Sequence, residues 1–137
     1  MKSIKIVANA DLLDDVINFL DEILEENDCP IKTQMQIDIV VEEVFVNIAY
    51  YDYDGYEGMV EIKVDITDNP RTVTIIFVDD GKPYDMRNTK EPDITLSAEE
   101  RKIGGLGIFM VKNSMDSVDY EYKDNQNIVT LKKRLFA

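Results

Sequence analysis

Two polar side chains stand four residues apart in an otherwise apolar stretch, VVEEVFVNIAYY, at residues 40–51. They are Glu43 and Asn47, and on a helix this spacing places both on one face. A carboxylate buried without partners is costly, so Glu43 needs a cation, hydrogen-bond donors or a wet cleft. One interpretation is a helix with a solvated edge that carries Glu42 and Glu43. The other is a metal–nucleotide site, in which Asn47 gives an amide oxygen to Mg²⁺ and Glu43 takes a proton from a nucleophile.

A second polar motif, VDDGKPYD, follows an apolar segment that predicts a central strand. Binding groups are often placed just beyond the ends of strands. Asp79 can accept a hydrogen bond from an exocyclic amine such as that of adenine. Guanine would present an oxygen there instead, and the desolvated carboxylate left without a donor would weaken binding by about 1–3 kcal/mol. Gly81 lets the backbone approach a flat ring closely. A simple turn explains the same residues equally well.

A third motif, KIGGLG, precedes a segment with helical character. Its glycines bring backbone N–H groups to the start of that helix, which suits phosphate oxygens; they are Gly104, Gly105 and Gly107. The Lys-Ser/Thr pair of a Walker phosphate loop does not follow. The alternative is a flexible loop before a helix. Arg101 and Lys102 lie just upstream, within reach of a terminal phosphate, although such a pair is more often solvated.

The remaining pattern predicts the elements that position these motifs. Thr33 is placed to cap the helix that carries Glu43. The order of elements predicts an α+β two-layer sandwich, a mixed, mostly antiparallel sheet covered on one face by helices. The expected strands are 3–8, 59–67, 72–80, 117–122 and 127–135, and the expected helices are 10–27, one that continues to about 51, and one from 104.

Composition narrows the class of protein. The chain has 137 residues, 45% of them hydrophobic and 31% charged, as expected for a single globular domain over 1–137. The net charge of −13 argues against direct binding of nucleic acid and favours a basic partner surface. No segment is apolar enough for a membrane span, and Cys29 has no second cysteine to pair with, so a cytoplasmic location is expected. Histidine is absent, which excludes a phosphohistidine on this chain.

In their order and spacing, the three motifs resemble the GHKL ATPase superfamily, which shares the Bergerat ATP-binding fold. Within it the chain looks most like the bacterial anti-sigma-factor serine/threonine protein kinases. The residues that carry the resemblance are EEVFVNIAYYDY (42–53), VDDGKPYD (78–85) and RKIGGLGIFMVKNSMDSVDYEY (101–122). Sensor histidine kinases share the fold but need a phosphorylated histidine, which this chain lacks.

The resemblance implies a role for each motif residue. Glu43 matches the family's general base, Asn47 its Mg²⁺ ligand and Asp79 its adenine-binding aspartate. ATP and Mg²⁺ are the implied cofactors, and residues 84–103 are the implied ATP lid. The remaining implied ATP-binding residues are Gly81, Pro83, Gly104, Gly105, Leu106 and Gly107.

The chain departs from the family pattern at three places. Tyr51 stands where a histidine or other polar residue often follows the motif asparagine, so that corner of the pocket differs. The Gly-Thr pair that many relatives carry before the last strand is absent from DNQNIVTLKK, which removes one adenine-side hydroxyl. No basic residue of the lid is assigned to the terminal phosphate, and this bears on the efficiency of catalysis.

The function implied is that of an ATP-binding anti-sigma factor. It would phosphorylate a serine or threonine of an anti-anti-sigma (STAS-type) protein and sequester a sigma factor, as a homodimer. The alternative is a non-catalytic module that uses ATP as a structural ligand and sequesters a partner. A third hypothesis, an ATP-independent interaction domain, leaves the register of the three motifs unexplained. The sequence does not identify the sigma factor, the phosphorylated residue or the signal.

Overall fold

The computed structural model describes residues 1–53, 57–88 and 111–136. Five strands form one sheet in the order β1-β2-β3-β5-β4, and each neighbouring pair is antiparallel. The α+β class expected from the sequence is confirmed, and the described strands contain no parallel pair. The strands are β1 (Lys2–Val7), β2 (Met59–Thr67), β3 (Thr72–Asp79), β4 (Ser117–Lys123) and β5 (Gln126–Arg134).

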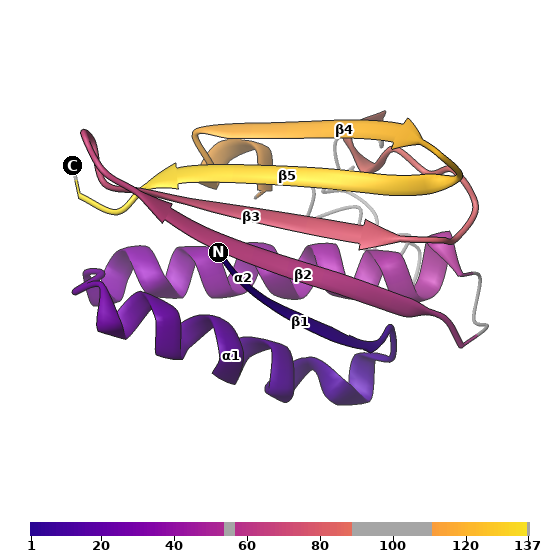
Figure 1. Cartoon of the computed structure of the whole chain (residues 1–137), viewed down its shortest axis with the longest axis horizontal. Coiled ribbons are helices and arrows are strands. Elements are labelled where there is room, and N and C mark those ends of the chain that lie inside the picture. The colour runs from indigo at the N-terminus through magenta and orange to yellow at the C-terminus, as the bar shows by residue number, and fades with distance from the viewer. Residues whose placement is uncertain (54–56, 89–110, 137) are drawn as a thin grey trace, which may run out of the picture.

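Two long helices lie side by side against one face of this sheet (Figure 1). They are α1 (Leu13–Glu26), preceded by the short 3₁₀ helix η1 (Ala10–Leu12), and α2 (Ile31–Asn47), which continues as the π-helical turn η2 (Ile48–Asp52). A further 3₁₀ turn, η3 (Met86–Asn88), follows β3, and residues 111–114 are helical. None of the helices in the described ranges is long and apolar enough to cross a membrane.

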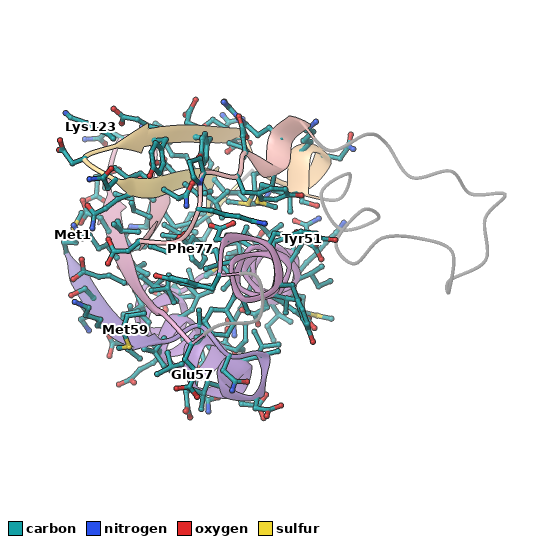
Figure 2. All side chains as sticks on the ribbon, turned by 90° about the vertical axis from the view of Figure 1, so that its right-hand side faces the viewer. Met1, Tyr51, Glu57, Met59, Phe77 and Lys123 are labelled. Carbon is teal, nitrogen blue, oxygen red and sulfur yellow. The ribbon has the colours of Figure 1, made fainter. Side chains whose placement is uncertain are left out.

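The core lies between the sheet and the two helices. On α1 the buried positions recur at helical spacing with acidic residues between them, and they are Val16, Leu20, Ile23 and Leu24. The central strand β3 buries alternate side chains, and Figure 2 shows Phe77 between the sheet and α2. Burying a side chain of this size stabilises the fold by about 1.5–3 kcal/mol. This packing fixes α2, and with it Glu43 and Asn47, against the sheet.

The start of α2 differs from the expected cap at Thr33, so that prediction was wrong. The helix begins at Ile31, directly after Pro30, whose φ is −57°. Proline has a fixed φ near the helical value and no N–H group to leave without a partner, so it suits a helix entrance. The carbonyl of Pro30 accepts the first helical hydrogen bond, from the Gln34 N–H at 2.9 Å.

Two carboxyl groups meet between α1 and α2. Asp21 and Asp38 each keep one buried oxygen without a hydrogen-bond partner among the described residues. Burial, a hydrogen bond to Asp21 and the charges of Asp21 and Glu25 raise the pKa of Asp38 to about 8. Because the folded protein holds this proton more tightly than the unfolded chain, stability falls as pH rises from 3.8 to about 8 and changes no further above it.

Replacing Asp38 with asparagine is therefore expected to stabilise the protein at pH 8, by about 1 kcal/mol once solvent screening of these half-buried groups is allowed for. The amide imitates the protonated acid and donates to Asp21 at every pH. Urea unfolding across the acidic to weakly basic range should show the gain shrink as pH falls. Asp15→Asn, on the exposed face of α1, is the matched control. An equal gain in both variants would assign the effect to net charge alone.

Candidate functional site

Glu43 and Asn47 are joined on one turn of α2, as their spacing predicted. Asn47 is 4% exposed, and its Nδ2 donates to Glu43 Oε1 at 2.6 Å and to the Glu43 carbonyl at 2.7 Å. Since both hydrogens of the amide are used, Oδ1 is the atom left to bind a cation. Burial raises the pKa of the Glu43 carboxyl, although the hydrogen bond from Asn47 opposes that rise. Glu42 alone is exposed, so a solvated edge describes Glu42 and not Glu43.

This pair fits a magnesium ion that is bound together with a nucleotide. Mg²⁺ takes oxygen ligands, keeps several waters and is usually held by one or two protein groups plus substrate phosphates. In the described part of the chain, no group of three or more His, Cys, Asp or Glu side chains is arranged to hold a metal ion. The Asn47 Oδ1 is suited to be one neutral ligand of an ion that phosphate oxygens hold in addition.

Asp79 ends β3 and is 1% exposed. Its Oδ1 accepts the Gly81 N–H at 2.9 Å and the Asn127 Nδ2 at 3.0 Å. Its Oδ2 is equally buried and has no N–H donor among the described residues. A buried acceptor left without a donor costs about 1–3 kcal/mol. Oδ2 is therefore the oxygen that has capacity for a donor on a ligand, as the adenine hypothesis requires.

Asn127, at the start of β5, connects this carboxylate to the loop after β3. The side chain is fully buried. Besides Asp79, its Nδ2 reaches the carbonyl oxygens of Gly81 at 3.3 Å and Lys82 at 2.9 Å. One amide thus holds both the Asp79 carboxylate and the backbone of the loop that follows β3.

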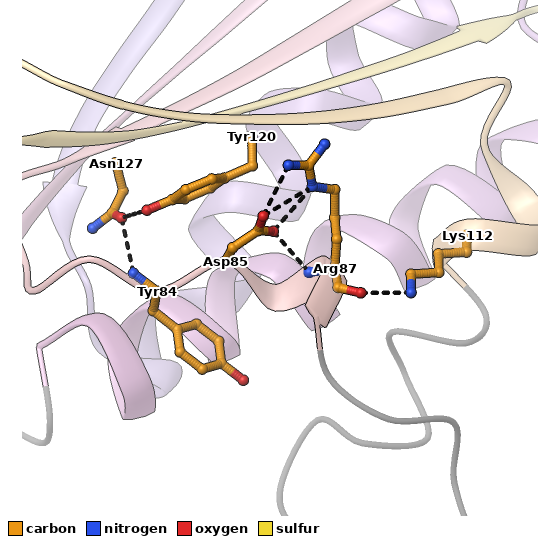
Figure 3. Close-up of polar contacts among 6 residues, drawn as sticks. All are labelled: Tyr84, Asp85, Arg87, Lys112, Tyr120 and Asn127. Atoms are coloured by element: carbon orange, nitrogen blue, oxygen red, sulfur yellow. Dashed lines mark hydrogen bonds and ion pairs between the residues drawn. The ribbon is translucent and has the colours of Figure 1, made fainter.

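The oxygen of the same amide accepts two further hydrogen bonds. The Tyr84 N–H donates to Asn127 Oδ1 at 3.2 Å, and the Tyr120 hydroxyl on β4 donates to it as well (Figure 3). Every hydrogen-bonding atom of the Asn127 side chain therefore has a partner, which is what a buried amide requires. β3, β4, β5 and the loop meet at this one group.

Sequence reasoning missed Asn127, which lies in the DNQN stretch that was interpreted as a turn and the start of a strand. The signal that could have found it is the strand register. β3 and β5 pair so that Asp79 stands opposite Asn127. A polar residue directly across from a functional aspartate is a candidate partner once the pairing is known, but the pairing is not local in sequence.

Gly81 is in close contact with η2. A Cβ at this position would lie 2.4 Å from the Asp52 carbonyl oxygen, so only glycine fits. The neighbouring Lys82 N–H donates to the same carbonyl at 2.8 Å. The structure thus gives Gly81 a contact with backbone, and its approach to a flat ring stays a prediction. Pro83 is exposed at the tip of this loop.

Tyr51 and Tyr84 stack across the site. Their ring centroids are 4.9 Å apart and the ring planes differ by 9°. Tyr51 belongs to η2, and Tyr84 lies in the loop after β3. The stack therefore joins η2 to the beginning of the expected lid. Burial raises the pKa of the Tyr51 phenol. Tyr51, one of the positions at which the sequence departs from the expected family pattern, is thus packed against a second aromatic ring.

Residues 84–88, the described part of the expected lid at 84–103, carry an ion pair. Arg87 makes a bidentate contact with Asp85, at 2.8 Å from Nη2 to Oδ2 and 3.0 Å from Nε to Oδ1, and its guanidinium lies 5.9 Å from the Tyr120 ring centroid (Figure 3). Burial alone would raise the pKa of Asp85, but the hydrogen bonds and charge of Arg87 lower it. Lys112 Nζ donates to the Arg87 carbonyl at 2.6 Å. The segments before and after residues 89–110 are tied together by this contact.

The glycine motif lies outside the described residues. Gly104, Gly105, Leu106 and Gly107, with most of the expected lid, fall in the range 89–110. Their assignment to ATP phosphates stays a prediction. The described site therefore comprises the Glu43–Asn47 pair, the Asp79–Asn127 network and the aromatic pair.

A single layer of helices on an antiparallel sheet, with an oriented Glu–Asn pair on one helix and a buried aspartate at a strand end, is the arrangement of a nucleotide-binding ATPase domain. Residues 6–133 match the histidine kinase-like ATPase domain family, and the chain belongs to this family.

Within this family, the chain is similar to serine-protein kinases of two Listeria species. The chain is 29% identical over 98 residues to the serine-protein kinase RsbW of Listeria monocytogenes serovar 1/2a, and 27% identical over 99 residues to that of Listeria innocua serovar 6a. Each match covers 69% of this chain and 62% of the relative, so the chain spans less than two thirds of these kinases. The resemblance drawn from the sequence is thereby confirmed.

Solved structures show the same fold at lower identity. The structure of the SiaB–SiaC complex from Pseudomonas aeruginosa matches 97% of this chain and 89% of its own chain, with a TM-score of 0.58 and 14% identity. The blue-light activated histidine kinase EL346 of Erythrobacter litoralis matches 79% of this chain and 32% of its own, with a TM-score of 0.57 and 18% identity. These matches support the fold.

Proposed function

We propose that this protein is an ATP-binding anti-sigma factor that phosphorylates a serine or threonine of an anti-anti-sigma (STAS-type) partner and sequesters a sigma factor. The observation that carries the proposal is the Glu43–Asn47 pair, in which a half-buried carboxylate of raised pKa lies beside an amide whose oxygen is left to bind a cation. The kinship with the RsbW serine-protein kinases supports the same activity.

In this proposal each described residue has one task. Glu43 accepts the proton of the partner's hydroxyl as its oxygen attacks the terminal phosphorus, and ADP leaves. Asn47 Oδ1 is a ligand of Mg²⁺, which neutralises charge on the phosphates when bound. Asp79 Oδ2 accepts the exocyclic amine of adenine. Gly81 and Pro83 shape the loop beside the base.

Other parts of the proposal rest on the family resemblance. Residues 104–107 bind the phosphates, residues 84–103 form the lid, and 1–137 is one homodimerising domain in the cytoplasm. The net charge of −13 suits a basic face on the sigma factor. Such binding should weaken steeply as the salt concentration rises.

One observation favours the alternative, a module that binds ATP and sequesters a partner without phosphorylating it. Arg87, the basic residue in the described part of the lid, is committed to Asp85. It is therefore not available to stabilise charge on a transferring phosphoryl group. A Glu43 variant that regulates its partner like the wild type would support this alternative.

Calorimetric titration with ATP and ADP, with and without Mg²⁺, tests the nucleotide site. Asp79→Asn is expected to weaken binding by about 10–100-fold, because a hydrogen bond to a charged acceptor contributes about 1.5–3 kcal/mol. Asn47→Ala should remove the gain in affinity that Mg²⁺ gives. Asp80→Asn, at the neighbouring exposed position, is the matched control and should bind as the wild type does. Absence of binding to the wild-type protein would refute the proposed function.

A further inference from the structure

The outer face of α2 carries a row of exposed apolar side chains. Ile31, Met35 and Ile39 follow one another at intervals of four residues, and 75%, 60% and 44% of their surfaces are exposed. Residues at this spacing lie on one face of a helix, and the side chains that α2 buries lie on the opposite face. Single exposed apolar residues are normal on a protein surface, whereas a contiguous group marks an interaction site. These three residues are called the apolar row below.

Carboxylates of α1 border the apolar row. The two helices lie side by side on one face of the sheet (Figure 1). Gln34, the neighbour of Met35 in the chain, donates from Nε2 to Glu25 Oε1 of α1 at 3.4 Å, and both side chains are at the surface. Asp14 and Asp21 precede Glu25 at helical spacing, so they lie on the same side of α1. An acidic edge therefore runs beside the apolar row.

The charge of the helical layer as a whole has one sign. Residues 13–47 contain ten Asp and Glu residues and one basic residue, Lys32. Twelve of the fifteen Lys and Arg residues of the chain come after residue 60. A partner that covers the apolar row thus meets an excess of negative charge. Complementary charge around an apolar contact favours the right partner, and like charge disfavours the wrong one, so a basic partner fits this surface.

A second copy of this chain fits the surface less well. In a two-fold symmetric dimer the same patch of both subunits forms the interface. A dimer built on the apolar row would bring the acidic helices α1 of both copies to one contact, with Lys32 as the single basic residue of each helical layer. The homodimer of the proposed function is therefore expected to use another surface.

We propose that the apolar row is the docking surface for a basic amphipathic helix of a partner protein. Apolar side chains of that helix cover Ile31, Met35 and Ile39, and its Lys and Arg side chains lie over the carboxylates of α1. Amphipathic helices are recognised in this way, by apolar anchors at helical spacing, while charges at the rim set the choice of partner. The inference rests on the proposed function for the identity of the partner, in which the sigma factor supplies the helix.

The test is the binding of a synthetic amphipathic peptide, with leucine at every third or fourth position and lysine at the others, measured by calorimetry on the whole chain. Met35→Glu is expected to weaken binding about tenfold or more, although it adds a negative charge that attracts the peptide. Met35 is exposed, so the substitution leaves the core unchanged. Tyr122→Glu, which adds the same charge at an exposed aromatic residue of β4, is the matched control and should bind as the wild type does.

The peptide with glutamate in place of lysine tests the role of charge, and it should not bind the wild-type protein. Equal binding of the two peptides, or an unchanged affinity in Met35→Glu, overturns the inference. Sedimentation of the wild type and of Met35→Glu at several concentrations tests the other occupant. A dimer of the wild type that Met35→Glu dissociates would assign the apolar row to a second copy and would also overturn the inference.

A second titration separates failure of this surface from failure of the proposed function. Sigma factors encoded in the same genome are titrated into the wild type and Met35→Glu, and the affinity for ADP is measured in parallel. Loss of sigma-factor binding in Met35→Glu at unchanged ADP affinity supports the inference. Equal binding by both proteins overturns the docking surface and leaves the proposed function intact. A wild-type protein that binds the lysine peptide but no sigma factor refutes the proposed sequestration and supports the surface alone.

Discussion

Replacing Glu43 with glutamine is expected to slow phosphoryl transfer to the partner by about 10²–10⁴-fold, the usual contribution of a positioned general base. ATP binding should stay close to that of the wild type. The reason is that Asn47 Nδ2 donates to Glu43 Oε1 at 2.6 Å, and a glutamine oxygen in the same place accepts the same bond. The substitution removes the basicity and keeps the orientation of the Asn47 amide.

The measurement is serine phosphorylation of an anti-anti-sigma protein from the same genome, followed by mass spectrometry, with ATP affinity measured in parallel. Glu42→Gln is the matched control, because Glu42 is adjacent, carries the same charge and is exposed. Transfer at the wild-type rate in Glu43→Gln would show that Glu43 is not the base. Loss of ATP binding in the same variant would make Glu43 part of the binding site instead.

The part of this site that could be predicted from the sequence is the part that local pattern determines. Glu43 and Asn47 are four residues apart on one helix, so helical geometry alone brings them together. Asp79 was found because it ends an apolar strand. The elements around these residues were also predicted from periodicity, and the structure changes mainly their ends.

The ends of elements depend on single residues whose effects compete. At α2, the helix begins after Pro30, before Thr33 is reached, because proline has a φ near the helical value and no N–H group of its own. At the other end, the α-helix gives way to η2 after Asn47. That change of winding places Tyr51 against Tyr84 and Asp52 against Asp79, and no local pattern in the sequence indicates it.

The residues that sequence reasoning missed are those whose partners are distant in the chain. Asn127 is 48 residues from Asp79, and their contact depends on the pairing of β3 with β5. Asp52 lies just beyond the helix that was expected to end at about 51, and its burial in η2 was not expected from the sequence. Long-range partners of a functional residue require the topology, whereas the functional residue itself is found from its motif.

Asn127→Ala is expected to have the largest effect on stability of the substitutions considered, a loss of about 2–4 kcal/mol. The amide is fully buried and serves Asp79, two loop carbonyls, the Tyr84 N–H and the Tyr120 hydroxyl. Alanine leaves these buried and partly buried groups without this partner. Tyr120→Phe removes one donor only and should cost about 1 kcal/mol.

Urea unfolding of the two variants, with Gln126→Ala as a neighbouring control, measures these differences. Asn127→Ala also distinguishes a role of Asn127 in stabilising the fold from a role in positioning the site. Asn127 fixes the orientation of the Asp79 carboxylate and of the loop at Gly81, so the folded fraction of Asn127→Ala should bind ADP more weakly than the wild type does. Wild-type affinity in that folded fraction would mean that the network stabilises the sheet without orienting Asp79. A loss of affinity would show that the amide at the start of β5 orients the Asp79 carboxylate for its ligand.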